Sequence, residues 1–431
     1  MSKRITNWFM LTLCCAAVML AGMLLLAENG YAATGVRGTD ISSPAPGYEF
    51  VLVEGDFSYT EKARLLNKVN EIRRNACING EPDPRNRNRR LTINDYVPLR
   101  WSADLEWCAQ TRAAEAALYD DHARPGHLQD ISYGTASHNS EILAWSMTDQ
   151  SADFLSDCID NWMIEHNFWT GGNYSWGGHY AALINPRNTY CAFGGFVPEG
   201  CLFGAGCGLF SSQSGLNETQ AGVRGKWLQV IEVRSGMMTV KKTQKFNVDK
   251  GKTKQAYLKG TSKYHNASTG DEDFEEKVTV YLMATGWKSK KPSIAKTDPA
   301  GNVRGKKTGK GSLYCTYNGK GYTVKVYVVN RKKVTPGKVK IKSVKANRKK
   351  MVIKWKRLSK KTKGYQVRLI DANTGSVLAS YSEKQRGSKT LSLTLWNIPK
   401  GKYKITVRAY NKKYGERYYG KWSKAKTVNV K

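Results

Sequence analysis

The charge and the hydrophobic periodicity of this chain both change near residue 240. Residues 1–240 carry 19 Lys and Arg against 25 Asp and Glu, whereas residues 241–431 carry 50 against 10. Apolar residues recur at helical spacing in the first half, and short alternating runs separated by turns fill the second half. A chain of 431 residues with such a change is expected to form several domains.

The N-terminal residues 1–32 are predicted to be a signal peptide. Two basic residues precede an apolar run from Trp8 to Leu26, and small residues follow it. The run is also long enough to span a bilayer, so an uncleaved N-terminal anchor is the alternative. Residues 33–57 are rich in Gly, Ser and Pro and are interpreted as a linker. The expected localisation is secreted or extracellular, including association with the cell surface.

Residues 58–234 predict an α/β domain with an antiparallel sheet. Helices are expected from Ser58 to about Cys77, from Ser102 to about Tyr119, and from about Ser151 to His166. Strands are expected at Tyr180 to Ile184, Tyr190 to Val197 and Trp227 to Val233.

Beyond about Met237 the pattern predicts only strands. Two of them are joined by the turn Asn318-Gly319, and evenly spaced short strands continue to the end of the chain. Cys315 lies on the inward-facing side of its strand and is interpreted as a small buried hydrophobe. Evenly spaced strands of this kind are typical of β-sandwiches.

The cysteines predict disulfides in an exported protein. Six of them lie between Cys77 and Cys207, so one to three bridges are expected there. Cys201 and Cys207, which flank a glycine-rich loop, form the easiest pair to imagine. No Cys-x-x-Cys spacing occurs, which argues against a cysteine-based zinc site.

Several motifs in the first half resemble those of the CAP superfamily, also called the SCP domain of cysteine-rich secretory proteins. They are Asn70-Glu71-Ile72-Arg73, Leu99 to Leu105, His122-Ala123-Arg124-Pro125, Ser140-Glu141-Ile142, Trp162 to Glu165, Gly178-His179-Tyr180 and Ile184 to Arg187. The resemblance implies an α-β-α sandwich at 58–234. It also implies a central cleft lined by two histidines and two acids, which by motif are His122, Glu141, Glu165 and His179.

The second half resembles two further modules. Residues 235–333 are similar to a bacterial group 2 Ig-like module, through Ser293 to Gly305 and the strand–turn–strand that follows. Residues 334–431 are similar to a fibronectin type III domain, through Trp355, Gly364 to Val367 and Gly420 to Ser423. The expected fold class is therefore multidomain, an α-β-α CAP-like sandwich followed by two all-β Ig-like and fibronectin-like sandwiches. Both modules imply a bacterial exported protein.

Imidazoles and carboxylates in one cleft would suit a divalent metal such as zinc, with His122 and His179 as candidate ligands. His127, His138 and His166 compete for these positions, whereas His265 is interpreted as solvated. No residue is assigned a catalytic role. Three motifs are absent from the sequence, Gly-x-Ser-x-Gly, His-Glu-x-x-His and a phosphate-binding glycine loop. The residues Ser140, Ile142, Ala181 and Ala182 depart from the usual motifs and make the cleft less polar.

Two functions remain open. The first is an exported protein that binds a small ligand or a partner in the CAP cleft and is held near the cell envelope by its basic half. The second is a metal-assisted hydrolase acting on peptide or cell-wall material. The basic half predicts an anionic cell-envelope polymer or a host or cell-surface partner, although lysines that only maintain solubility are the alternative. Nucleic acid is the least favoured partner, because no recognition motif accompanies the lysines.

Overall fold

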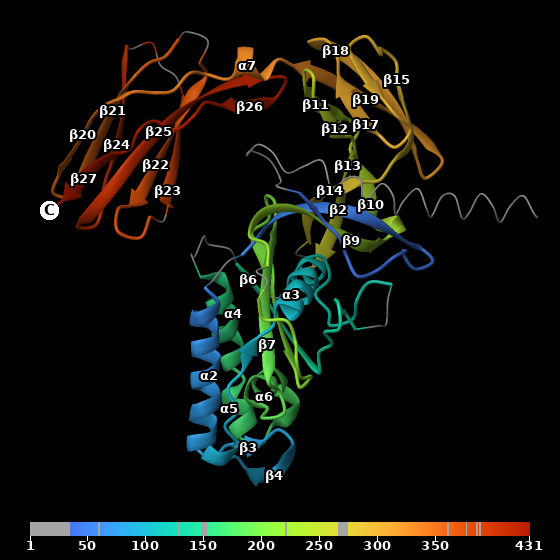
Figure 1. Cartoon of the computed structure of the whole chain (residues 1–431), viewed down its shortest axis with the longest axis vertical. Coiled ribbons are helices and arrows are strands. Elements are labelled where there is room, and N and C mark those ends of the chain that lie inside the picture. The colour runs from blue at the N-terminus through green and yellow to red at the C-terminus, as the bar shows by residue number, and fades with distance from the viewer. Residues whose placement is uncertain are drawn as a thin grey trace, which may run out of the picture. The chain divides into compact units, whose positions relative to one another are not determined.

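The structure of the chain is a computed structural model that describes residues 35–58, 61–126, 130–147, 153–219, 222–265, 275–359, 362–375, 377–384, 387 and 389–431. Figure 1 shows the two compact units of the chain. The first comprises the described parts of Met1–Gln244 and Tyr257–Ala284, and the second comprises Lys245–Ala256 and the described parts of Thr285–Lys431. The predicted signal peptide at 1–32 lies outside the described residues. No helix in the described ranges is long and apolar enough to cross a membrane.

A ten-stranded sheet forms the centre of the first unit. Its path runs β10-β13-β14-β2-β7-β8-β6, while β9 pairs with β1 and β2, and β5 pairs with β7. Its strands are β1 (Val36–Arg37), β2 (Tyr48–Phe57), β5 (Arg100–Trp101), β6 (Ser140–Met147), β7 (Tyr190–Pro198), β8 (Phe203–Ser211), β9 (Gly225–Arg234), β10 (Met238–Val240), β13 (Leu258–His265) and β14 (Glu275–Leu282). A separate hairpin consists of β3 (Pro82–Asp83) and β4 (Asn86–Arg90).

Helices cover both faces of this sheet. A side chain at Gly194 of β7 would meet the backbone of α3, and one at Gly195 would meet Phe154 of α4, and neighbouring strand residues point to opposite faces. The three predicted helices are present as α2 to α4, and Ser102 caps α3 by accepting from the Leu105 N–H. The helical segments are α2 (Lys62–Ile78), η1 (Ile93–Asp95), α3 (Ala103–Ala116), α4 (Phe154–Met163), α5 (His166–Thr170), η2 (Tyr174–Trp176), α6 (Gly178–Ile184) and η3 (Ser235–Met237).

Gly194 allows α3 to lie directly against the sheet. A Cβ atom there would lie 2.3 Å from the Gln110 backbone nitrogen. A backbone atom cannot move aside as the end of a flexible side chain can. We expect Gly194→Ala to lower the free energy of unfolding of the first unit by about 1–3 kcal/mol through overpacking. Urea unfolding measures the effect, and Gly236→Ala is the matched control because its Cβ would meet open space. Equal costs for the two variants would contradict this packing.

Three segments differ from the sequence predictions. Residues 33–57, expected as a linker, contain β2, which pairs with β9 along its whole length and buries Val51 to Val53. Tyr180 to Ile184, expected as a strand, lies in helix α6. Leu183 and Ile184 follow Tyr180 by about one helical turn, and all three are buried. The predicted Ig-like region 235–333 contributes to both units, because β10, β13 and β14 extend the sheet of the first.

The predicted disulfides are not formed. Cys207, the expected partner of Cys201, is a buried free thiol on β8. Buried free thiols also occur on other elements of the first unit, at Cys77, Cys108, Cys158 and Cys191. The sheet separates several of them, since Cys108 belongs to α3 on one face and Cys158 to α4 on the other. Burial raises the pKa of Cys108 and of Cys191 to about 12. These thiols therefore behave as small apolar core residues, as predicted for the buried Cys315.

The second unit is built from several separate β-sheets and the four-residue helix α7 (Arg331–Val334). Asn318 and Gly319 adopt positive φ at the predicted hairpin turn. One four-stranded sheet contains β11 (Lys245–Asp249), β19 (Lys320–Val329), β18 (Gly309–Tyr317) and β15 (Thr285–Ser289), and a three-stranded sheet contains β12 (Thr253–Gln255), β17 (Asn302–Gly305) and β16 (Ala295–Thr297).

The C-terminal part of this unit has two further sheets that share one core. Trp355 and Ile353 from one sheet and Tyr365, Val367 and Val407 from the other belong to a single cluster of buried residues. The first sheet contains β20 (Ile341–Asn347), β21 (Lys350–Lys356) and β24 (Thr390–Leu395). The second contains β23 (Val377–Lys384), β22 (Gly364–Asp371), β25 (Gly401–Lys413), β26 (Glu416–Tyr419) and β27 (Lys426–Val430).

Candidate functional site

Four side chains from different elements of the first unit line one cavity. Glu141 projects from β6, Glu165 lies between α4 and α5, and His179 is in the first turn of α6. His122 lies in the loop that follows α3. All four line a cavity of about 490 Å³, so the structure brings together the residues that the motifs selected.

Each histidine is paired with one glutamate. The Nδ1 atom of His122 lies 3.0 Å from Oε1 of Glu141, and the Nδ1 atom of His179 lies 2.6 Å from Oε1 of Glu165. The centroids of the two imidazole rings are 5.9 Å apart, and the ring planes are tilted by 31°. A carboxylate at Nδ1 favours the tautomer protonated there, which leaves Nε2 as an acceptor or a metal ligand. Neither Nε2 atom has a hydrogen-bond partner among the described residues.

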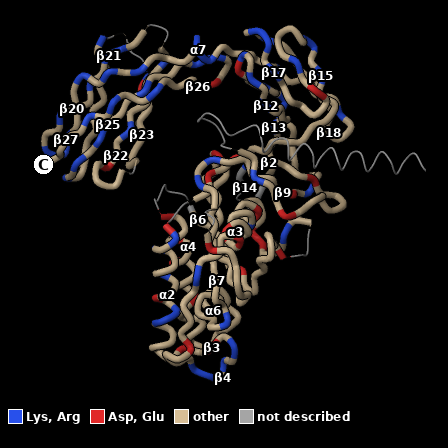
Figure 2. The backbone as a smooth tube through the Cα atoms, viewed as in Figure 1, with Lys and Arg blue, Asp and Glu red and all other residues tan. Residues whose placement is uncertain are grey.

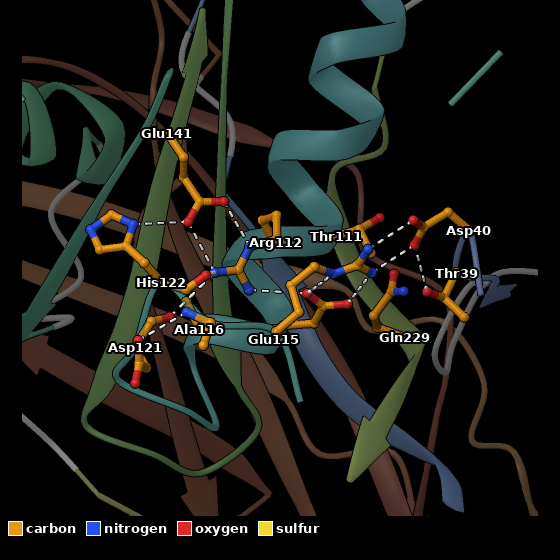
Figure 3. Close-up of polar contacts among 12 residues, drawn as sticks. Thr39, Asp40, Thr111, Arg112, Glu115, Ala116, Asp121, His122, Glu141 and Gln229 are labelled. Atoms are coloured by element: carbon orange, nitrogen blue, oxygen red, sulfur yellow. Dashed lines mark hydrogen bonds and ion pairs between the residues drawn. The ribbon is translucent and has the colours of Figure 1, made fainter. Parts of the chain in front are cut away.

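Glu141 is held from behind by Arg112 of α3, whose side chain is only 1% exposed. The guanidinium Nε donates to Oε2 at 2.7 Å and Nη2 donates to Oε1 at 3.0 Å (Figure 3). Burial alone would raise the pKa of Glu141, but the hydrogen bonds from His122 and Arg112 outweigh it and lower that pKa to about 2. Glu141 is therefore a fixed anion at neutral pH.

Arg112 also begins a chain of buried ion pairs. Its Nη1 atom donates to Glu115 at 3.0 Å, and Arg124 donates to both oxygens of Glu115 at 3.0 and 2.8 Å. Arg124 also donates to both oxygens of Asp40, at 2.8 and 2.7 Å. The network ties the segment before β2 to the helix that supports the cleft, and Arg112 Nη2 further donates to the His122 carbonyl at 3.2 Å.

Glu165 is held by backbone donors instead of a buried cation. Its Oε2 atom accepts from the backbone N–H groups of His179 at 2.7 Å and of Tyr180 at 3.4 Å, at the start of α6. Burial opposes ionisation, but the hydrogen bonds from His179 and Tyr180 prevail and lower the pKa of Glu165. Both carboxylates of the cleft are therefore ionised, and their oxygens are occupied by groups that they orient.

The competing histidines do not join this arrangement. His166 Nε2 lies 3.1 Å from Glu81 Oε1, and its ring packs edge-on against Tyr180. His138 does not line the cavity of the four cleft residues, but it lines a second cavity of about 260 Å³ together with His122 and Glu141. Burial lowers the pKa of His138. His127 lies outside the described residues. Within the described ranges no group of three or more His, Cys, Asp or Glu side chains could hold a metal.

Sequence reasoning missed Arg112 and the aromatic residues of the cavity. An arginine between Cys108, Ala109 and Ala113 on the buried side of a predicted helix was an available signal, because a cation there requires a partner. Trp169, Tyr174 and Trp176 also line the cavity. They lie in the segment between two recognised motifs.

Comparison with known families identifies one domain. Residues 66–194 match the model of the CAP family, described as the cysteine-rich secretory protein family, so the chain contains a CAP family domain. The match includes all four residues of the His/Glu cleft. No match was found among curated proteins.

Some solved structures are similar to parts of the chain. A myokine structure is 17% identical, with a TM-score of 0.18, and the match covers 22% of this chain and 96% of that one. The FN1–FN3 domains of chicken CNTN1 are 15% identical, with a TM-score of 0.24, and the match covers 52% of this chain and 79% of that one. A cytokine receptor complex is 12% identical, with a TM-score of 0.20, and the match covers 45% of this chain and 96% of that one.

The buried ion pair predicts unequal costs for neutralising the two glutamates. Glu141→Gln removes one of the two carboxylates that compensate Arg112, and we expect it to lower the free energy of unfolding by about 3 kcal/mol. Glu165→Gln removes a more exposed acceptor and should cost about 1 kcal/mol. Urea unfolding of the full chain at neutral pH compares the two variants. A smaller loss for Glu141→Gln than for Glu165→Gln would contradict the assigned role of Arg112.

The same ion pair predicts a pH dependence. Because its pKa is lowered on folding, Glu141 binds fewer protons in the folded state than in the unfolded state. Its stabilising effect is complete above the ordinary value of 4.5 and is lost as the pH falls toward about 2. We expect the free energy of unfolding of the wild type to fall more steeply across this range than that of Glu141→Gln. Parallel pH curves would exclude this contribution.

Proposed function

We propose that this chain is an exported bacterial protein whose CAP domain binds a ligand in the His/Glu cleft. Its basic Ig-like and fibronectin-like sandwich domains would keep it near the cell envelope or at another anionic surface. One observation carries the cleft proposal, namely the two imidazole rings whose centroids lie 5.9 Å apart and whose Nδ1 atoms are each paired with a carboxylate. The apolar run within 1–32 supports export.

The state of the carboxylates favours ligand binding over acid–base catalysis. An efficient general base has a pKa near the working pH, whereas the pKa of Glu141 is lowered to about 2. Both oxygens of Glu141 accept from Arg112, and Oε2 of Glu165 accepts from two backbone N–H groups. Both glutamates thus orient the imidazole rings of His122 and His179, and the Nε2 atoms of these rings are available to bind a ligand.

His122 and His179 would hold a divalent metal such as zinc through these Nε2 atoms. Two protein ligands fit a weakly held, exchangeable ion better than a resident catalytic one, which usually has three. A bound ion would polarise an oxygen of the ligand or of water. Glu141 and Glu165 would keep both rings in the orientation that binding requires. This geometry is also what favours the second candidate function, a metal-assisted hydrolase acting on peptide or cell-wall material.

Zinc titration of the full chain tests the cleft. We expect the wild type to bind one zinc ion and His122→Ala/His179→Ala to bind it at least about tenfold more weakly, because both imidazole ligands are lost. His166→Ala is the control, since that ring pairs with Glu81 outside the cleft. Isothermal titration calorimetry measures the affinities. Equal zinc affinity in the double variant would refute the assignment.

An activity assay separates the two candidate functions. The hydrolase proposal expects the zinc-loaded wild type to release products from peptide or cell-wall material, and the double variant to release none. A wild type that binds zinc but leaves both substrates intact supports ligand binding alone.

The composition of the second unit supports an anionic partner. This unit contains 45 Lys and Arg but only 5 Asp and Glu, and Figure 2 shows the basic positions spread along its backbone. Asp249 pairs with Arg331, and Asp371 accepts N–H groups of its own turn, from Asn373 and Thr374. Few carboxylates are thus available to neutralise the lysines. Such a surface attracts polyanions over about a Debye length.

Binding of the full chain to dextran sulfate at low and high salt tests this attraction. We expect affinity that falls steeply with added salt and is absent for neutral dextran. A variant with Gln at Lys345, Lys354 and Lys356, exposed residues of β20 and β21, should bind more weakly, because it lowers the charge of one sheet. If neither added salt nor these substitutions changed the affinity, the lysines would not attract the polymer, and only their role in solubility would remain.

A further inference from the structure

The cavity of the His/Glu cleft extends onto an aromatic shelf. Trp176 of η2 lines the cavity with 68% of its surface exposed, and Phe168 of α5, 43% exposed, lies beside it with a centroid distance of 6.4 Å. Large aromatic side chains exposed next to a polar cavity commonly mark a binding surface. We call Trp176, Phe168 and Tyr174 the aromatic shelf.

The aromatic shelf rests on a rigid base. Trp169 beneath it is 2% exposed and donates its indole N–H to the Pro82 carbonyl at 2.9 Å. Tyr174 packs edge-on against Trp169 with centroids 4.8 Å apart. Gly177 lets the chain pass close to this tryptophan, since a Cβ there would lie 3.0 Å from the Trp169 Cβ. The shelf is therefore held in position before any ligand arrives.

One arginine stands at the edge of the aromatic shelf. Arg87 of β4 is exposed, lines the cavity, and places its Cζ atom 4.9 Å from the Tyr174 ring centroid. Its neighbours in the hairpin are already engaged, because Arg85 and Arg89 both bind Asp83 and Asp95. Arg87 has no ion pair with any described residue. A stacked guanidinium keeps its N–H edge available for a carboxylate or a phosphate.

These features together define a ligand class. The aromatic shelf, the Arg87 guanidinium and the two imidazole Nε2 atoms lie around one cavity of about 490 Å³. We infer that the cleft binds an anionic saccharide, an inference that rests on the proposed ligand-binding function. The C–H face of a sugar ring would pack on Trp176. Its carboxylate or phosphate would bind Arg87, and its hydroxyl groups would face the imidazoles.

The geometry of the shelf disfavours a ligand ring that is held between two parallel aromatic side chains. A ring held in this way needs the two side chains about 7 Å apart. Phe168 and Trp176 are instead tilted by 43° with centroids 6.4 Å apart, so they present one open surface and no slot. A single open surface suits the ring of a sugar.

Calorimetric titration of the full chain with trigalacturonic acid tests this inference. Salt of about 0.15 M is used because it screens attraction to the exposed lysines of the second unit beyond a Debye length of about 8 Å and leaves direct contacts in place. We expect Trp176→Ala and Arg87→Gln each to weaken binding by about tenfold, the size of one stacking or charge-assisted contact. Arg90→Gln, on the same exposed strand but outside the cavity, should bind as the wild type does. The neutral methyl ester of the trisaccharide lacks the carboxylates that would bind Arg87. Its affinity for the wild type should therefore be as low as the affinity of the acid for Arg87→Gln.

Three results would overturn the inference. One is equal affinity of the trisaccharide for the wild type, Trp176→Ala and Arg87→Gln, and another is equal affinity of the wild type for the acid and its ester. The third is an oligoglutamate peptide that binds more tightly than the trisaccharide through Arg87 and Trp176, which would assign the cleft to acidic peptides. Zinc binding that depends on His122 and His179 would persist in each case, so failure here is distinct from failure of the proposed function.

Discussion

Arg112 lies in the middle of α3 with 1% of its side chain exposed, and its guanidinium donates to Glu141 on β6 and to Glu115 on its own helix. A cation removed from water is tolerated only when carboxylates and carbonyls occupy its N–H groups. Arg112 meets this condition through two glutamates and the carbonyls of the loop that carries His122. The buried guanidinium of Arg112 therefore determines the charge of Glu141 and the course of the loop that carries His122, and through both it determines the position of the His122 ring.

The two halves of the cleft are supported in different ways. On the Glu141 side the support is ionic and continues through Glu115 and Arg124 to Asp40. On the Glu165 side it consists of backbone N–H groups at the start of α6, where an anion is favoured by unpaired amide donors. Both arrangements fix an ionised carboxylate against Nδ1 of a histidine. The cleft thus presents two oriented imidazoles whose acidic partners are already engaged.

Local patterns predicted helices α2 to α4 and strands β7 and β9 of the first unit, because caps and alternation are readable over a few residues. The four cleft residues were predicted from the resemblance to the CAP superfamily. Local patterns did not predict α6, since seven residues are too few to separate a helical period from alternation. They also missed β2 (Tyr48–Phe57), whose partner strands β7 (Tyr190–Pro198), β9 (Gly225–Arg234) and β14 (Glu275–Leu282) all lie far from it in sequence. The position of Arg112 on the buried side of a predicted helix indicated that it needs a partner, but only the tertiary structure shows that this partner is Glu141. Trp176 likewise reaches the cleft only through tertiary contacts.

The sheet of the first unit takes strands from two separated stretches of the chain. β13 and β14 return after β11 and β12 have joined the second unit, and β14 covers the edge of β2 at Val51 to Val53. The two units are therefore not independent modules joined end to end. A cut between β12 and β13 would remove β13 and β14 from the sheet of the first unit, and the apolar edge of β2 at Val51 to Val53 would then be open to pairing with other strands. During synthesis β14 can pair with β2 only after β11 and β12 of the second unit have been made.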